Sequence, residues 1–346
     1  MSQQPVVYWQ YLQLPKLLDC QRPPGRELAH HDEHLFIVAH QAFELWFKQI
    51  LFEVRHARDV LGQPGRPAAD RQVPETDIPE ICATLGRVVE ILRLLTQQWH
   101  VVETMPPGNF LAFRDLLIPA SGFQSLQFRL VEIVSGLPAD ARVSIDGRPF
   151  SSRFSPELQA ELAAAAGEMT LRQALLDWLA RTPLDAPFPA FAEAFAGAYD
   201  GYTDAQRALQ LANPYLPSER RAAIEARFEN EKAACRAFLR DRAHAAFLFL
   251  ASYREEPLLR WPSALVEQVI AYEEALRIFR FRHARMVERM IGLRVGTGGS
   301  TGVDYLDETA RRHRIFGELL TAQSFLLPRE RLPAVPHPEL LGFRFQ

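Results

Sequence analysis

Two histidines stand at positions where helical spacing would place buried apolar side chains. His40 lies within one apolar run, and His283 fills the one open slot in a second run of four-three spacing. One interpretation is a haem pocket, with one imidazole as axial iron ligand and the other as a polar group over the opposite face. Its walls would be four phenylalanines, Phe36, Phe43, Phe47 and Phe279. The other interpretation is two core histidines bonded to carbonyl groups, and the residues alone are compatible with both.

A metal site without haem is less well supported. Helical metal sites place a second ligand three or four residues from the first, so that both side chains share a face. We expect no acid or second histidine at that spacing on the apolar face of either His40 or His283.

A third group that could do chemistry is Arg114, in the stretch "NFLAFRDLL". Phe110 precedes it by four residues, so one helix face would present an aromatic ring and a guanidinium together. That pair suits a ligand with a ring and a carboxylate. The alternative is a surface arginine paired with Asp115 or Glu103.

The cluster "GTGGSTG", residues 296–302, raises the possibility of a phosphate-binding loop. Such loops follow a strand and open a helix, and the ATP-binding type also has a lysine after the glycines. Here a helical pattern precedes the cluster and no lysine follows it. We therefore expect a flexible or tightly turned loop, beginning one or two helical turns beyond His283, that could close over a ligand.

The elements that must position these groups are helices throughout. Apolar periodicity predicts long helices over 34–61, 78–105 and 263–292, and a short helix, a break at "PASG" and another helix up to 135. Residues 137–155 have turn chemistry and predict a loop or small hairpin. Residues 156–250 are helical in pattern, with breaks at "RTPLDAPFP" and "NPYLPS". The fold class is therefore all-α.

Composition limits the possible partners. The 346 residues, 48% of them hydrophobic, can form one large domain with an insertion, and the net charge of -3 provides no attraction for nucleic acid or an anionic membrane. Cys20, Cys82 and Cys235 lie too far apart in sequence to suggest a disulfide framework or a thiolate zinc site. Without a secretory signal or a long apolar run, we expect a soluble, cytoplasmic protein.

Three segments together carry a family resemblance. "HDEHLFIVAHQAFELWFKQILFEV", "FRDLLIPASGFQSLQFRL" and "RHARMVERMIGLRVGTGGSTGVDYL" closely resemble the tryptophan 2,3-dioxygenase family. The resemblance covers residues 8–135 and about 260–330 in order, with "FLLP" near the end. It implies an all-helical haem-binding bundle that forms a single domain over 1–346, with an N-terminal arm over 1–30 and a variable helical insertion over about 137–250.

The resemblance also implies roles for individual residues. His283 matches the proximal ligand of the haem iron, and His40 matches the distal histidine that accepts a hydrogen bond from the indole N–H. Arg114 matches the arginine that binds the substrate carboxylate, and Thr297 the loop threonine that holds the ammonium and carboxylate groups.

Further matches concern the walls of the pocket and its edges. Arg129 resembles a partner of the haem propionates. The remaining matched positions all line or reach the substrate pocket: Phe36 and Phe110 as aromatic walls, Ser121 and Gly122 on the distal face, and Tyr8 and Tyr11 as tyrosines that reach into a neighbouring subunit.

The activity that the resemblance implies is haem-dependent opening of the indole ring of L-tryptophan by O2, giving N-formylkynurenine at the start of the kynurenine pathway. Haem b would be the cofactor, O2 the co-substrate, and the assembly a homotetramer. Four departures from the family pattern, which we expect near the pocket rim, leave an alternative open: Trp9, the "MPPGNF" turn, Leu116 and Phe279. That alternative is a haem oxygenase of a substituted tryptophan, inserting one or two oxygen atoms. A further alternative is a non-catalytic helical binding protein.

Overall fold

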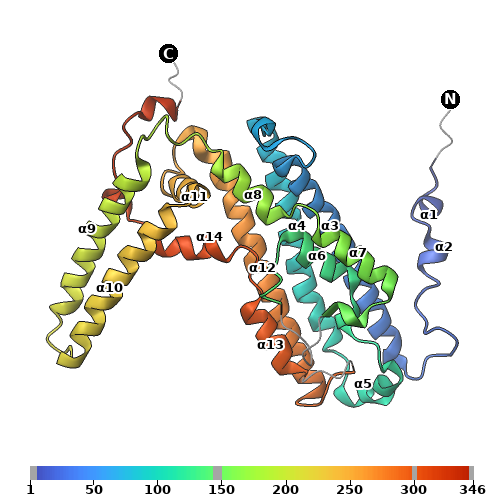
Figure 1. Cartoon of the computed structure of the whole chain (residues 1–346). Coiled ribbons are helices and arrows are strands. Elements are labelled where there is room, and N and C mark those ends of the chain that lie inside the picture. The colour runs from blue at the N-terminus through green and yellow to red at the C-terminus, as the bar shows by residue number, and fades with distance from the viewer. Residues whose placement is uncertain (1–5, 143–149, 298–301, 343–346) are drawn as a thin grey trace, which may run out of the picture.

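The computed structural model describes residues 6–142, 150–297 and 302–342, and every regular element within these ranges is helical (Figure 1). This confirms the predicted all-α class. The α-helices are α1 (Tyr8–Tyr11), α2 (Leu14–Leu17), α3 (His31–Gly62), α4 (Ile78–Val102), α5 (Pro107–Arg114), α6 (Leu126–Ser135), α7 (Pro156–Ala166), α8 (Leu171–Ala180), α9 (Phe191–Leu211), α10 (Ser218–Leu239), α11 (Arg242–Ser252), α12 (Arg260–Ile291), α13 (Val303–Arg312) and α14 (Gly317–Ala322).

Short 3-10 turns join these helices. They are η1 (Ala68–Asp70), η2 (Glu75–Asp77), η3 (Asp115–Leu117), η4 (Gly122–Gln124), η5 (Phe150–Arg153), η6 (Pro257–Leu259), η7 (Gln323–Phe325), η8 (Arg329–Arg331) and η9 (Pro338–Leu340).

The centre of the molecule is a bundle of three long helices, in which α4 packs against both α3 and α12, while α6 packs on α3. The apolar stripe predicted for α4 is buried along its whole length, as expected for a helix with neighbours on one side. The predicted stripe of α12 is buried too, from Val269 to Met290. His283 stands half-buried in the slot that this stripe leaves open.

The predicted boundaries are close to those observed, and the differences follow from local capping. Helix α3 begins three residues earlier than predicted, where the His30 imidazole accepts a hydrogen bond from the Asp32 backbone N–H at 3.1 Å. It ends at Gln63, whose left-handed φ of 42° terminates the helix. Helix α4 ends at Val102, short of the predicted residue 105, because "MPPGN" already opens α5.

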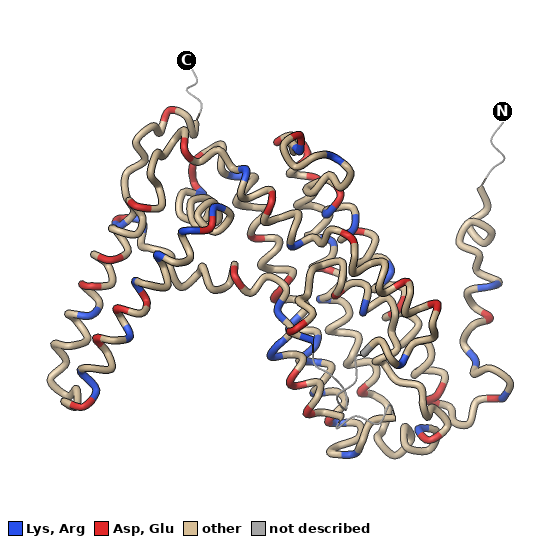
Figure 2. The backbone as a smooth tube through the Cα atoms, in the orientation of Figure 1, with Lys and Arg blue, Asp and Glu red and all other residues tan. Residues whose placement is uncertain are grey.

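The region predicted to be helical between 156 and 250 consists of α7 to α11, and both predicted breaks are present. The prediction of a loop or hairpin over 137–155 lies partly outside the described residues, and η5 occupies part of the remainder. Helices α9 and α10 form an antiparallel pair that extends away from the central bundle (Figure 1). Acidic and basic residues are interspersed along the helices (Figure 2).

Helix α3 buries a carboxylate as well as its apolar residues. Glu53 is buried, with 4% of its surface exposed. Its carboxylate accepts hydrogen bonds from Arg87 of α4 at 2.7 Å and from Gln49 at 2.6 Å, which compensates for its burial. It lies outside the cavity described below.

The N-terminal arm runs beside the bundle as the short helices α1 and α2 (Figure 1). The Gln41 side chain fixes the base of the arm to α3, since it donates to the Cys20 carbonyl at 2.7 Å and accepts from Gln21 at 2.8 Å. Tyr8 and Tyr11 are 73% and 74% exposed, so the arm carries its aromatic residues away from its own core.

No described helix is both long enough and apolar enough to cross a membrane.

One close approach of two helices depends on a glycine. A Cβ added at Gly62 would clash with the Met169 sulfur and lie 2.9 Å from the Ala174 Cβ, whereas a Cβ at Gly86 would meet only the flexible Gln268 side chain at 3.5 Å. We predict that Gly62→Ala lowers the free energy of unfolding by about 1–3 kcal/mol through overpacking. The control Gly86→Ala should raise it by up to ~1 kcal/mol through helix propensity. Urea unfolding measures both, and equal effects would contradict this packing.

Candidate functional site

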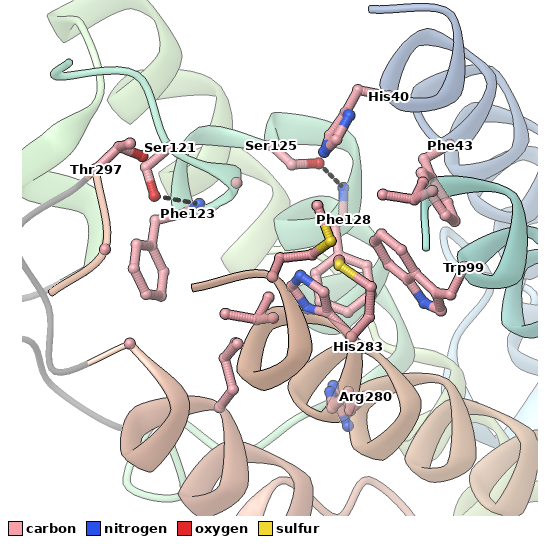
Figure 3. Close-up of a pocket in the computed structure, with 18 of the residues that line it drawn as sticks. His40, Phe43, Trp99, Ser121, Phe123, Ser125, Phe128, Arg280, His283 and Thr297 are labelled. Carbon is pink, nitrogen blue, oxygen red and sulfur yellow. Dashed lines mark hydrogen bonds between the residues drawn. The ribbon is translucent and has the colours of Figure 1, made fainter. Parts of the chain in front are cut away.

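A cavity of about 250 Å³ lies between α3, α4, α6 and α12 and the segment that follows α12 (Figure 3). Twelve of the residues proposed from the sequence line it: Phe36, His40, Phe43, Phe47, Phe110, Arg114, Ser121, Gly122, Arg129, Phe279, His283 and Thr297. These residues are spread over 262 positions of the sequence, from 36 to 297. Tyr8 and Tyr11 do not line it.

His40 presents a hydrogen-bond acceptor to this cavity. Its Nδ1 lies 2.7 Å from the Phe36 carbonyl oxygen, one turn earlier on α3. A carbonyl can only accept, so Nδ1 carries the proton and Nε2 of the neutral ring is left as an acceptor. Burial lowers the pKa of His40 despite this hydrogen bond. The ring is therefore neutral at pH 7.

His283 lies on another side of the cavity, on α12 (Figure 3). Its ring stacks on the Trp99 indole, with centroids 4.6 Å apart and planes 11° from parallel. Burial, with His40 and Arg129 nearby, lowers the pKa of His283 to about 4, so its imidazole is neutral. Within the described part of the chain, nothing hydrogen-bonds to this ring. Such an imidazole is suited to ligate a metal.

Aromatic rings make up most of the wall between the two histidines. The Trp99 ring also stacks on that of Phe43, with centroids 4.1 Å apart, and its centroid lies 5.7 Å from that of Phe279. At the other end, Phe36 lies 5.7 Å from Phe110, which comes from α5. The cavity thus has flat apolar walls that suit planar ligands.

Arg114 both lines the cavity and pairs with Asp115. Its side chain lines the cavity and is only 15% exposed, and its Nη1 also lies 3.6 Å from the Asp115 carboxylate. Its Nη2 donates a hydrogen bond to the Val295 carbonyl, in the segment after α12. The guanidinium therefore holds this segment against the end of α5.

Thr297 makes the second link between the same two segments, since its hydroxyl donates to the Ala120 carbonyl at 2.8 Å. Residues 298–301, which hold most of the predicted glycine loop, lie outside the described residues. At the far side of that loop, Gly302 has a φ of +61°, and a Cβ there would lie 2.9 Å from the Arg294 carbonyl. Position 302 therefore requires a glycine.

Ser121 and Gly122 belong to a short capped turn beside Thr297. The Ser121 hydroxyl accepts from the Phe123 backbone N–H, and the Gln124 side chain accepts from the Ser121 backbone N–H at 3.2 Å (Figure 3). This reciprocal cap fixes the backbone beside the cavity.

The polar end of the cavity contains charged residues from α6 and α12. Arg129 donates to Glu132 at 2.8 Å, and Arg280 of α12 donates to the same carboxylate at 2.8 Å. Tyr305 hydrogen-bonds Arg129. Nothing near Glu132 in the sequence points to its partner Arg280, which lies 148 residues later.

The expectation that no acid shares a face with either histidine is wrong for Glu44. This residue follows His40 by four positions and lines the cavity. Burial raises the pKa of Glu44, while the Ser125 hydroxyl hydrogen-bonds it and opposes that rise. Because Glu44 is four residues from His40 on a predicted helix, the sequence could have placed both on one face. The described residues nevertheless contain no group of three or more histidine, cysteine or acidic side chains that could hold a metal ion.

The departures from the family pattern lie at different depths. Phe279 lines the cavity but is 4% exposed, so it belongs to the wall and not to the rim, which corrects its expected position. Leu116 is 55% exposed and Trp9 is 52% exposed, and neither lines the cavity. Met105, the first residue of the "MPPGNF" turn, does line it.

Fold and site together define an all-helical protein with a largely aromatic cavity that is lined by three histidines and three arginines. Residues 1–326 match the family model described as tryptophan 2,3-dioxygenase. A tryptophan 2,3-dioxygenase from Sorangium cellulosum is 37% identical, with 98% of this chain and 88% of the relative aligned. A tryptophan 2,3-dioxygenase 2 from Ralstonia nicotianae is 38% identical over 96% of both chains, and a tryptophan 2,3-dioxygenase from Xenopus tropicalis is 34% identical over 98% of this chain and 86% of its own length. The chain belongs to the tryptophan 2,3-dioxygenase family of oxidoreductases.

The lowered pKa of His40 predicts how the stability of the protein without cofactor depends on pH. Unfolded His40 titrates near 6.5, and the folded residue titrates lower. As the pH falls below 6.5, the unfolded chain takes up a proton that the folded chain does not, so the free energy of unfolding falls. His40→Gln should make this loss less steep, measured by urea unfolding between pH 7 and pH 4. The exposed His34→Gln on the same helix serves as control, and identical slopes for the two variants would refute the argument.

Proposed function

We propose that this protein is a haem-dependent tryptophan 2,3-dioxygenase, which opens the indole ring of L-tryptophan with O2 to give N-formylkynurenine. The observation that carries the proposal is the neutral His283 imidazole, which has no hydrogen-bond partner in the described chain and shares its cavity with the neutral His40. In this reaction both oxygen atoms enter the product and no external reductant is consumed. The names of the relatives support the same activity.

The residues present fit a haem group. His283 provides a neutral nitrogen ligand, the stacked Trp99 and Phe43 provide flat apolar walls, and Arg129 provides a cation at the polar end for a carboxylate. When bound, haem supplies the iron at which O2 is activated toward the electron-rich double bond of the indole.

The chain's own residues bind and orient the substrate. In our proposal, Arg114 binds the carboxylate of the amino acid, and Thr297 binds its ammonium and carboxylate groups. The Nε2 of His40 accepts the indole N–H, which its tautomer permits because Nδ1 is bonded to Phe36. Phe36 and Phe110 pack on the ring. These contacts exclude water and hold the reacting carbon atoms in one place.

We further propose a homotetramer in which the arm of one subunit completes the site of another. The exposure of Tyr8 and Tyr11, and their absence from the cavity of their own chain, support this assignment. Ser121 and Gly122 would then line the distal side. The three cysteines are free, and Cys82 and Cys235 are buried, which suits a reducing cytoplasm.

A second candidate is oxygenation of a substituted tryptophan. Phe279 and Met105, two departures from the family pattern, line the cavity and could alter its shape. The two candidates differ in the substrate that is preferred and in the number of oxygen atoms inserted.

The first test of the function is a product assay. Haem-loaded, reduced protein should convert L-tryptophan under air to a product heavier by two oxygen atoms, and His283→Ala should lose both the Soret band and turnover. A gain of one oxygen atom, or turnover of methyl-tryptophans only, would favour the second candidate. A protein with no Soret band after addition of hemin would be a non-catalytic binding protein.

A second prediction concerns how the substrate is held. Arg114→Ala should raise KM for tryptophan more than His40→Ala, because a charge-assisted clamp contributes roughly 2–4 kcal/mol and a neutral hydrogen bond about 1 kcal/mol. In steady-state kinetics, KM should therefore rise about 30-fold or more in Arg114→Ala and about fivefold in His40→Ala. Arg114→Lys, which keeps the charge but not the planar fork, should fall between wild type and Arg114→Ala. Equal effects of the two alanine variants would place the carboxylate elsewhere.

A further inference from the structure

The carboxylate of Glu132 is the point at which three elements of the site meet. It is 2% exposed. Its Oε2 accepts from Arg129 Nη1 at 2.8 Å, and its Oε1 accepts from Arg280 Nη2 at 2.8 Å and lies 3.2 Å from Nδ1 of His313. Because a carboxylate only accepts, Nδ1 of His313 is the protonated nitrogen.

The positions of these partners in the sequence show what the carboxylate holds together. Arg280 lies three residues before His283 on α12, and His313 directly follows α13. The segment between them, residues 281–312, carries both His283 and Thr297. One carboxylate of α6 is thus bonded to both ends of the segment that provides the proposed iron ligand and the loop threonine.

The base of this segment, where Arg280 and His313 lie close together, is held by further hydrogen bonds. Arg280 Nη1 donates to the His313 carbonyl at 3.2 Å. Glu273, also on α12, accepts from the backbone N–H groups of Ile315 and Phe316 at 2.8 and 3.1 Å. Helix α13 packs along α12. The described parts of the segment, 281–297 and 302–312, therefore form the two arms of a hairpin whose base is fixed, and Glu132 joins that base to α6.

The Glu132 carboxylate is the negative group to which Arg129, Arg280 and His313 are bonded. Burial acts to raise the pKa of Glu132, but Arg129, His313 and Arg280 hold it well below its usual range. Burial lowers the pKa of His313 in spite of Glu132, so His313 is neutral at pH 7. Two buried guanidiniums thus share this carboxylate beside the cavity.

We propose that Glu132 is a positioning residue for the cofactor site: it fixes the hairpin 281–312 and the Arg129 guanidinium relative to each other, so that the iron ligand and the cation for a haem carboxylate stand at the right separation. The proposal rests on the proposed haem-dependent function. It gives a role to a carboxylate that lines the cavity but is already bonded to three side chains of the protein. Loss of the Glu132 charge would remove the acceptor that Arg129 and Arg280 share and release the hairpin base from α6.

The test compares Glu132→Gln with Glu53→Gln. Glu53 is an equally buried carboxylate, also paired with an arginine, but it does not line the cavity. Both variants should lose stability in thermal unfolding. Only Glu132→Gln should weaken hemin binding, by roughly tenfold or more in a Soret titration of the apoprotein, and broaden the spectroscopic signature of axial histidine ligation. A dissociation constant for Glu132→Gln equal to that of wild type, or an equal loss in Glu53→Gln, would overturn the proposal.

A second pair of variants covers the case in which Glu132→Gln does not fold. The amide nitrogen of asparagine can take the place of imidazole Nδ1, whereas leucine cannot donate a hydrogen bond. His313→Leu should weaken hemin binding several-fold, and His313→Asn should restore it. Equal binding by the leucine variant and wild type would refute a positioning role for this cluster.

Failure of this inference is distinguishable from failure of the proposed function. If wild type binds hemin in a manner that depends on His283 while Glu132→Gln and His313→Leu bind it equally well, the function stands and the inference falls. If wild type does not bind hemin at all, both fall together.

Discussion

The half-buried His283 imidazole, which has no hydrogen-bond partner in the described chain, is the constraint on which the rest of this site depends. Burial removes hydrogen bonds that water would make to a neutral imidazole, and no group in the described chain replaces them at His283. Stacking on Trp99 holds the ring in place but satisfies neither nitrogen. A ligand that accepts the nitrogen lone pair would satisfy the ring. Under the proposed function, that ligand is the haem iron.

The cavity is lined both by aromatic rings and by a cluster of charged side chains. Rings from α3, α4 and α12 surround the two histidines, whereas Arg129, Glu132 and Arg280 gather at the other end of the cavity. Arg280 and His283 lie on the same helix, one turn apart, so α12 contributes to both regions. The cationic group also acts on His283, because Arg129 adds to burial in lowering its pKa and so favours the neutral imidazole.

The sequence alone predicted much of the fold but less of the site. Helical periodicity located α4 and α12, because their buried stripes arise from local spacing that neighbouring helices then cover. It also singled out His283, as a polar residue in an apolar series. It did not identify Glu53 or Glu132, because a buried carboxylate is stabilised by partners distant in sequence, Arg87 and Arg280. Arg114 remained ambiguous until the structure placed it in the cavity, and the roles assigned to the individual residues come from family resemblance.

The contacts of Arg114 and Thr297 bear on how a substrate would enter under the proposed function. Both side chains already bond backbone carbonyls, those of Val295 and Ala120, and these bonds hold the segment after α12 against the end of α5. A substrate carboxylate would replace a neutral carbonyl on Arg114 with a charged acceptor, which strengthens a hydrogen bond roughly twofold. Because this hydrogen bond already fixes the guanidinium, binding of the carboxylate should be strict in geometry. Selectivity for an amino acid over indole alone would then arise because only a ligand with a carboxylate offers Arg114 a charged acceptor in place of the Val295 carbonyl.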